Sequence, residues 1–99
     1  MTLYQILTQL NRPVAYGYHS SDQELPYFCI MGAGQDQFEA DNTYYTTKDL
    51  YQVEYYFKTK DPSFEQEIET LLLEHGFKYY KSEDVYLDDQ DVFVIYYDI

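Results

Sequence analysis

Residues 49–81 read DLYQVEYYFKTKDPSFEQEIETLLLEHGFKYYK, and this stretch decides the fold. Its first part alternates apolar and polar residues, a period typical of a strand that rests one face on a core. The apolar positions are Tyr51, Val53, Tyr55 and Phe57. Asp61 then stands where a side chain can cap a helix, and Pro62 occupies the first helical position, where its missing N–H costs nothing. The stretch therefore predicts a strand that leads directly into a helix.

The predicted helix carries one apolar stripe and a clear end. The stripe comprises Phe64, Ile68, Leu71, Leu72 and His75, at the spacing of one helical face. Gly76 can adopt the left-handed conformation that ends a helix, and Phe77 can then fold back onto the last turn. The acids of the helix are expected on its outer face, namely Glu65, Glu67, Glu69 and Glu74. A further strand is expected to follow from Tyr79.

The rest of the chain predicts short elements around this unit. Thr2 is expected to cap a short helix with Leu3, Ile6, Leu7 and Leu10 on one face. Apolar or alternating runs predict strands at residues 14–19, 25–31, 79–87 and 92–99, with a hairpin turn at 88–91. The polar segment 32–48 is expected to be a long loop, which is usually functional, mobile or a projecting hairpin. The predicted fold class is α+β, an antiparallel or mixed sheet of about five strands with two helices packed on one face.

Composition predicts one domain, residues 1–99, and excludes several classes of function. Hydrophobic residues make up 45% of the chain, which is enough to build a core. The 18 acidic and 6 basic residues give a formal net charge of −12, which repels nucleic acid and anionic membrane. Cys29 is the single cysteine, so no intramolecular disulfide can form. Because no signal peptide or long apolar run is present, we expect a soluble intracellular protein.

No set of residues predicts catalysis or metal binding. His19 and Cys29 could meet as base and nucleophile, but no third group that would orient them is identifiable. His75 is better explained by the favourable helix dipole at the last turn. The acids Asp84, Asp88, Asp89 and Asp91 lack the alternating spacing and the central glycine of a calcium-binding loop. We therefore expect no enzyme activity, no cofactor and no metal ion.

Tyrosine is unusually frequent, with 14 Tyr and no Trp in the chain. Four doublets occur, at residues 44–45, 55–56, 79–80 and 96–97. Successive residues of a strand point to opposite faces, so at least one ring of each doublet is expected to face away from the helices. Two explanations stand equally open. The outward rings either pair across strands in the ordinary way, or they form a second buried face with a partner subunit.

One ordered series of residues runs along nearly the whole chain. It comprises Leu25-Pro26-Tyr27, Phe38, Ala40-Asp41-Asn42, Tyr51, Val53-Glu54-Tyr55, Lys60-Asp61-Pro62, Glu65, Glu69, Gly76, Tyr79-Tyr80-Lys81 and Tyr96. This series resembles a family of small neck proteins found in long-tailed phages and prophages of Gram-positive bacteria. The family is similar to the tail terminator, or tail completion, group. No catalytic residues carry over, because that family is structural.

The resemblance implies a structural virion protein, an α/β subunit that forms a homo-oligomeric ring, usually a hexamer. The ring would cap the tail tube of major tail protein and join it to the head connector proteins. The implied location is the virion neck, after assembly in the bacterial host cytoplasm. The candidate contacts with a neighbouring subunit or the tail tube are Phe38, Asp41, Tyr44, Tyr45, Tyr56, Tyr80 and Tyr97. Some of the excess acid is expected to line the channel, so that DNA passes through without direct affinity for the ring. No membrane partner is expected.

Two other functions are alternatives. A head–tail adaptor or head-closure protein of the same neck would share this size and fold class. A small acidic DNA mimic that inhibits a nuclease would share the charge of −12. Mimicry, however, needs carboxylates arrayed along one face at phosphate-like spacing, and the acids of this chain are scattered over turns and the outer side of a helix.

Overall fold

The computed structural model describes residues 2–17, 24–40 and 44–99, with the backbone alone described at 36–40 and 44–48. Two helices and six strands form in this part of the chain. They are α1 (Leu3–Thr8), β1 (Val14–Tyr16), β2 (Tyr27–Ala40), β3 (Tyr44–Phe57), α2 (Pro62–Glu74), β4 (Tyr80–Lys81), β5 (Val85–Leu87) and β6 (Val92–Asp98). The predicted α+β class is confirmed. The strand count exceeds the predicted five because residues 79–87 form two short strands, β4 and β5, instead of one.

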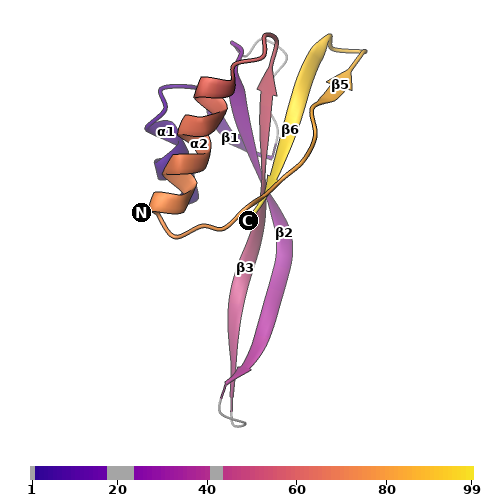
Figure 1. The fold of residues 1–99 in the computed structure, drawn as a ribbon. Coiled ribbons are helices and arrows are strands. Elements are labelled where there is room, and N and C mark those ends of the chain that lie inside the picture. The colour runs from indigo at the N-terminus through magenta and orange to yellow at the C-terminus, as the bar shows by residue number, and fades with distance from the viewer. Residues whose placement is uncertain (1, 18–23, 41–43) are drawn as a thin grey trace.

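The strands form one mixed sheet in the order β1-β2-β3-β6-β4, with β5 also paired to β6. β1 runs parallel to β2, and the other neighbouring strands are antiparallel. Figure 1 shows α1 and α2 together on one side of this sheet, as predicted. The turn between β5 and β6 at residues 88–91 is also confirmed, since Leu87 and Val92 pair across it.

Both helices begin as their sequences predict and α2 also ends as predicted, whereas α1 ends at Thr8 and leaves Leu10, which was expected on its apolar face, outside the helix. Thr2 and Gln5 form a capping box at the start of α1, each side chain accepting from the other's backbone N–H. The Asp61 side chain accepts from the Phe64 N–H at 3.2 Å and caps α2. At the far end Gly76 has φ +83°, and the Phe77 N–H donates to the Leu72 carbonyl at 2.9 Å. These bonds satisfy end groups of α2 that would otherwise lack partners.

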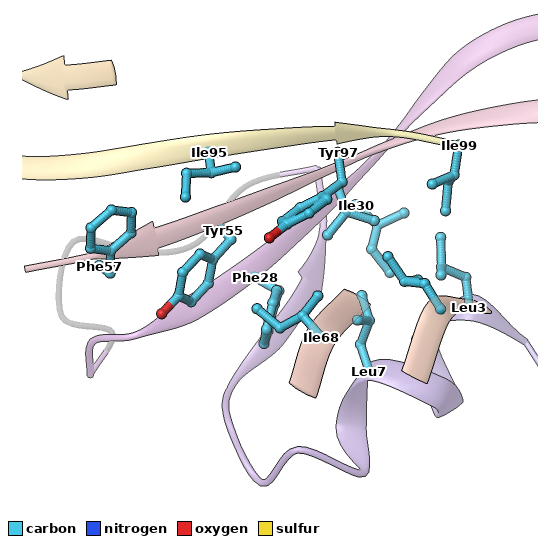
Figure 2. Packing of buried hydrophobic residues seen from close by; sticks show 12 residues of the cluster. Leu3, Leu7, Phe28, Ile30, Tyr55, Phe57, Ile68, Ile95, Tyr97 and Ile99 are labelled. Carbon is cyan, nitrogen blue, oxygen red and sulfur yellow. The ribbon is translucent and has the colours of Figure 1, made fainter. Parts of the chain in front are cut away.

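The core lies between the two helices and the face of the sheet that they cover. Figure 2 shows the side chains that fill it, which include Leu3, Leu7, Phe28, Ile30, Tyr55, Phe57, Ile68, Ile95, Tyr97 and Ile99. The rings of Phe28 and Tyr55 lie 5.4 Å apart, and those of Tyr55 and Phe57 lie 5.1 Å apart. His75, predicted as the end of the helical stripe, is an exposed C-cap residue. The buried stripe of α2 therefore ends one turn earlier, at Leu72.

Segment 32–48, predicted to be loop-like with a projecting hairpin as one possibility, consists largely of strand, because β2 and β3 continue through most of it. Each strand has 14 residues, and their pairing extends to the Ala40/Tyr44 pair. A bulge between Gly32 and Gln35 interrupts the register where Gly34 has φ +99°. Beyond it, residues 35–40 and 44–49 form a two-stranded ribbon, here called the arm. Figure 1 shows the arm extending away from both helices, and the molecule measures 51 × 26 × 22 Å. Of the three predicted roles for segment 32–48, the projecting hairpin is the one that forms.

Candidate functional site

The arm is a ribbon of two strands with no further strand at either edge in the described residues. β1 stops pairing with β2 at Ile30, and β6 stops pairing with β3 at Gln52, apart from two backbone bonds between Tyr51 and Ile99. The outward N–H and C=O groups beyond these points lack sheet partners within the described chain. A two-stranded hairpin alone is only marginally stable in water. The arm is therefore the part of this fold that contact with another protein surface would stabilise most.

Three predicted contact residues, Phe38, Tyr44 and Tyr45, belong to the arm. In the β2/β3 register Phe38 is opposite Thr46, and Tyr45 is opposite Glu39. Asp41 lies outside the described residues. The register brings the two aromatic-bearing segments of the predicted contact set onto one ribbon, although they are separated in the sequence.

Tyr56 lies on the sheet face opposite the helices, where cross-strand pairing accounts for part of its burial. Its ring stacks on Tyr27, with centroids 4.9 Å apart. Its hydroxyl donates to Glu54 Oε1 at 2.6 Å. Burial, followed by this bond to a carboxylate, raises the pKa of Tyr56 well above the usual value. Contacts within one chain therefore account for part of the burial of the Tyr56 ring.

Tyr97, predicted as a subunit contact, is a core residue, and that prediction is wrong. The register pairs Tyr97 with Val53, which turns its ring toward the helices and leaves it 0% exposed. Its hydroxyl donates to Glu69 Oε2 at 2.9 Å. Tyr96, the other member of the doublet, is half-buried. The two doublets 55–56 and 96–97 each have one ring in the core, as the alternation predicts.

Tyr80 is the most exposed large hydrophobic residue of the described chain, at 83%. It stands on the edge strand β4, opposite Asp98 of β6. A hollow of about 660 Å³ opens here at the root of the arm. Apolar and aromatic side chains provide most of its lining, among them Ala33, Leu50, Tyr51, Tyr79, Tyr80 and Ile99. The hollow includes Leu50 and Tyr51 of β3, the residues that follow the arm, so the hollow and the arm are adjacent candidate contact regions.

Glu65 was expected on the outer face of α2, but its side chain is buried, with the residue 2% exposed. Lys60 approaches Glu65 Oε2 at 2.8 Å, and Lys81 approaches Oε1 at 2.9 Å. Lys81 also reaches Glu69 Oε2 at 2.8 Å. These four residues form an ion cluster, here called the clasp, which ties α2 to β4. Glu67 and Glu74 are exposed, as predicted.

The clasp favours the charged forms of Glu69 and Lys81. Partial burial opposes the charge on Glu69, but bonds from Lys81 and Tyr97 outweigh it and hold the pKa below the usual value of 4.5. Burial likewise opposes the charge on Lys81, yet its bonds to Glu69 and Glu65 raise its pKa above 10.5. Because every carboxylate faces a lysine, the cluster suits a structural role better than acid–base chemistry. Sequence reasoning missed it because the lysines come from outside the helix.

Some of the residues considered for catalysis and metal binding have other partners, and His19 lies outside the described residues. Among the described residues, no group of three or more His, Cys, Asp or Glu is arranged to hold a metal ion. Asp91 accepts from Lys58 and from the Tyr86 hydroxyl, the latter at 2.6 Å. Cys29 is buried at 3% exposure, and its suggested partner His19 is not described. No helix in residues 2–17, 24–40 or 44–99 is long and apolar enough to cross a bilayer.

Comparison with known proteins does not extend these observations. No protein-family model matches the chain, and no curated protein matches it. The candidate contact surface is therefore defined by the geometry alone, and it comprises the arm, Tyr80 and the hollow beside it.

Proposed function

We propose that this chain is a structural protein of a tailed phage, a tail terminator or tail completion subunit that forms a ring. The ring caps the tail tube of major tail protein and joins it to the head connector. The protein works in the virion neck and is assembled in the bacterial cytoplasm. Its ring order is six, by resemblance to the family. It acts as a scaffold and not as an enzyme.

The arm is the observation that carries this proposal. Within residues 2–17, 24–40 and 44–99, no strand pairs with the edges of the arm and no helix covers it, so its own chain gives it little stabilisation. A neighbouring subunit or the tail tube would stabilise the arm by covering it. The exposed ring of Tyr80 and the apolar hollow at the root of the arm extend the same surface. Large, stiff aromatic side chains are typical of such contacts.

The charge of −12 supports a channel through which DNA slides without binding. The same charge gives less support to the alternative function, a small acidic DNA mimic that inhibits a nuclease. Five ion pairs tie lysines to Glu65, Glu69, Asp84 and Asp91. Carboxylates that are neutralised in this way do not present a row of free negative charge. A head–tail adaptor of the same neck stays the closest alternative, and binding to the tube separates the two.

The experiment is a binding assay with tubes assembled from the major tail protein of the phage or prophage that carries this gene. The full chain is expected to cap tube ends as rings in electron micrographs and to sediment with the tubes. A variant that joins Gln35 to Asp49, a cross-strand pair, through an Asn-Gly turn removes most of the arm while preserving the body. It is expected to unfold at the same temperature as the full chain and to lose ring formation.

The matched control changes the other hairpin, with D89N and Q90G in the turn at the opposite end of the molecule (Figure 1). This control is expected to assemble normally. Two results would contradict the proposal: a full chain that ignores tail tubes, or an armless variant that forms rings as well as the control does. A full chain that binds purified connector but not tubes would indicate the adaptor instead.

A further inference from the structure

A pocket of about 330 Å³ lies where β3 ends and α2 begins, far along the sheet from the arm. Aromatic and apolar side chains supply much of its lining, chiefly Tyr55, Phe57, Phe64, Leu25 and Pro26. Its size is at the lower end of the range for small-molecule sites, which are typically apolar with a few polar groups that converge. The pocket shares no lining residue with the hollow at the root of the arm.

Tyr55 contributes a hydroxyl group to the lining of this pocket. Tyr55 is only 1% exposed, and its hydroxyl has no hydrogen bond within the described residues. Figure 2 shows this oxygen pointing away from Tyr97 and out of the cluster of buried side chains. Burial raises the pKa of Tyr55, so the hydroxyl keeps its proton and remains a donor. The residue is buried, but its hydroxyl is open to the pocket and has no partner among the described residues, which favours a ligand that accepts from it.

Basic residues gather at this pocket in an otherwise acidic protein. Arg12, Lys58 and Lys60 all line it, and they are half of the 6 basic residues in the chain. Lys58 is paired with Asp91, and Lys60 with acids of its own. Arg12 has no ion pair in the described part of the chain. The uncommitted positive charge of the pocket is therefore that of Arg12.

We propose that this pocket binds a small monocarboxylate that carries an apolar body. The guanidinium of Arg12 matches a carboxylate in planar geometry, and the Tyr55 hydroxyl donates to it from below. The apolar body lies against the aromatic wall. Asp61 also lines the pocket, so a second negative charge on the ligand is disfavoured. This distinguishes a carboxylate, with one negative charge, from inorganic phosphate, which is a mixture of singly and doubly charged ions at neutral pH.

The test uses benzoate as the probe and amide NMR spectra of the full chain at constant ionic strength. Benzoate is expected to shift the resonances of Lys58, Lys60 and the Arg12 side chain along a saturable curve. Benzamide, a neutral probe of the same shape, and inorganic phosphate are expected to leave them nearly unmoved. Dissociation constants on the order of 1 mM are expected for so small a ligand.

Two variants test the assigned donors. R12Q and Y55F are each expected to weaken benzoate binding by about tenfold, the value of a hydrogen bond to a charged group. K78Q removes the same charge from a lysine beside a different hollow, and it is expected to bind benzoate as the parent chain does. The proposal is overturned if benzoate causes no saturable shift, if benzamide or phosphate binds equally well, or if R12Q and Y55F bind like K78Q.

Discussion

Replacing Tyr97 with phenylalanine is expected to destabilise this protein, whereas the same change at Tyr55 is expected to be nearly neutral. Both rings are buried in one core, at 0% and 1% exposure. They differ in the partner of the hydroxyl. That of Tyr97 donates to Glu69, and that of Tyr55 makes no hydrogen bond among the described residues. The pair therefore isolates one hydrogen bond while ring packing stays constant.

The magnitude follows from the charge on the acceptor. A hydrogen bond to an ionised group contributes about 1.5–3 kcal/mol to the free energy of unfolding. Glu69 keeps its bonds from Lys81 and Tyr79 in the Tyr97→Phe variant, so the lower end, about 1.5 kcal/mol, is expected. The Tyr55→Phe variant loses no such bond and is expected to stay within about 0.5 kcal/mol of the parent.

The assay is urea and thermal unfolding followed by far-UV circular dichroism, with equal urea dependence in all three proteins as the check on two-state behaviour. For a domain of this size, 1 kcal/mol corresponds to about 4–8 °C in Tm. Tyr97→Phe is therefore expected to melt roughly 6–12 °C lower than the parent. Equal losses in both variants, or no loss at Tyr97, would refute the reasoning from hydroxyl partners.

Three further predictions concern the clasp and the end of α2. Changing Lys60 and Lys81 together to Met leaves the carboxylate of Glu65 buried without a cation, and this is expected to lower the free energy of unfolding by about 3–5 kcal/mol. Glu65→Gln instead leaves two lysines that can reach water, so its loss in urea unfolding is expected to be less than half of that. Glu69 has a lowered pKa in the folded state, so its contribution is full above its unfolded pKa and is lost as pH falls through the folded value. The stability advantage of the parent over Glu69→Gln is therefore expected to shrink below about pH 4.5, and a constant difference down to about pH 3 would contradict this. Gly76→Val forces a β-branched residue to φ +83° and is expected to cost about 1 kcal/mol or more, so an unchanged Tm would contradict the C-cap assignment.

Local features of the fold were predictable because their causes lie within a few residues. The Asp61 cap, the Gly76 end and the alternation through Val53 and Phe57 each depend on neighbouring backbone groups or on one period. The same holds for the capping box at Thr2. These features can therefore be predicted without knowledge of the rest of the chain.

The arm was not predictable as strands for a related reason. Period-2 alternation is typical of a strand with a core beneath one face, and the core of the described residues does not extend beneath the arm. Gly32 and Gly34 near its root, and the polar residues beyond them, therefore read as a loop. Pairing with β3, a long-range interaction, is what makes this segment extended.

The sequence by itself determined where α2 begins and ends, which face of β3 is apolar, and that the protein is strongly acidic. Only the tertiary structure decided that Tyr97 faces the core and that Glu65 is buried between two lysines. It also brought Arg12 to the same pocket as the Tyr55 hydroxyl. The physical reason is the distance along the sequence over which each interaction acts. Caps and periods act over a few residues, whereas strand register and ion clusters join residues that meet only after the sheet has formed.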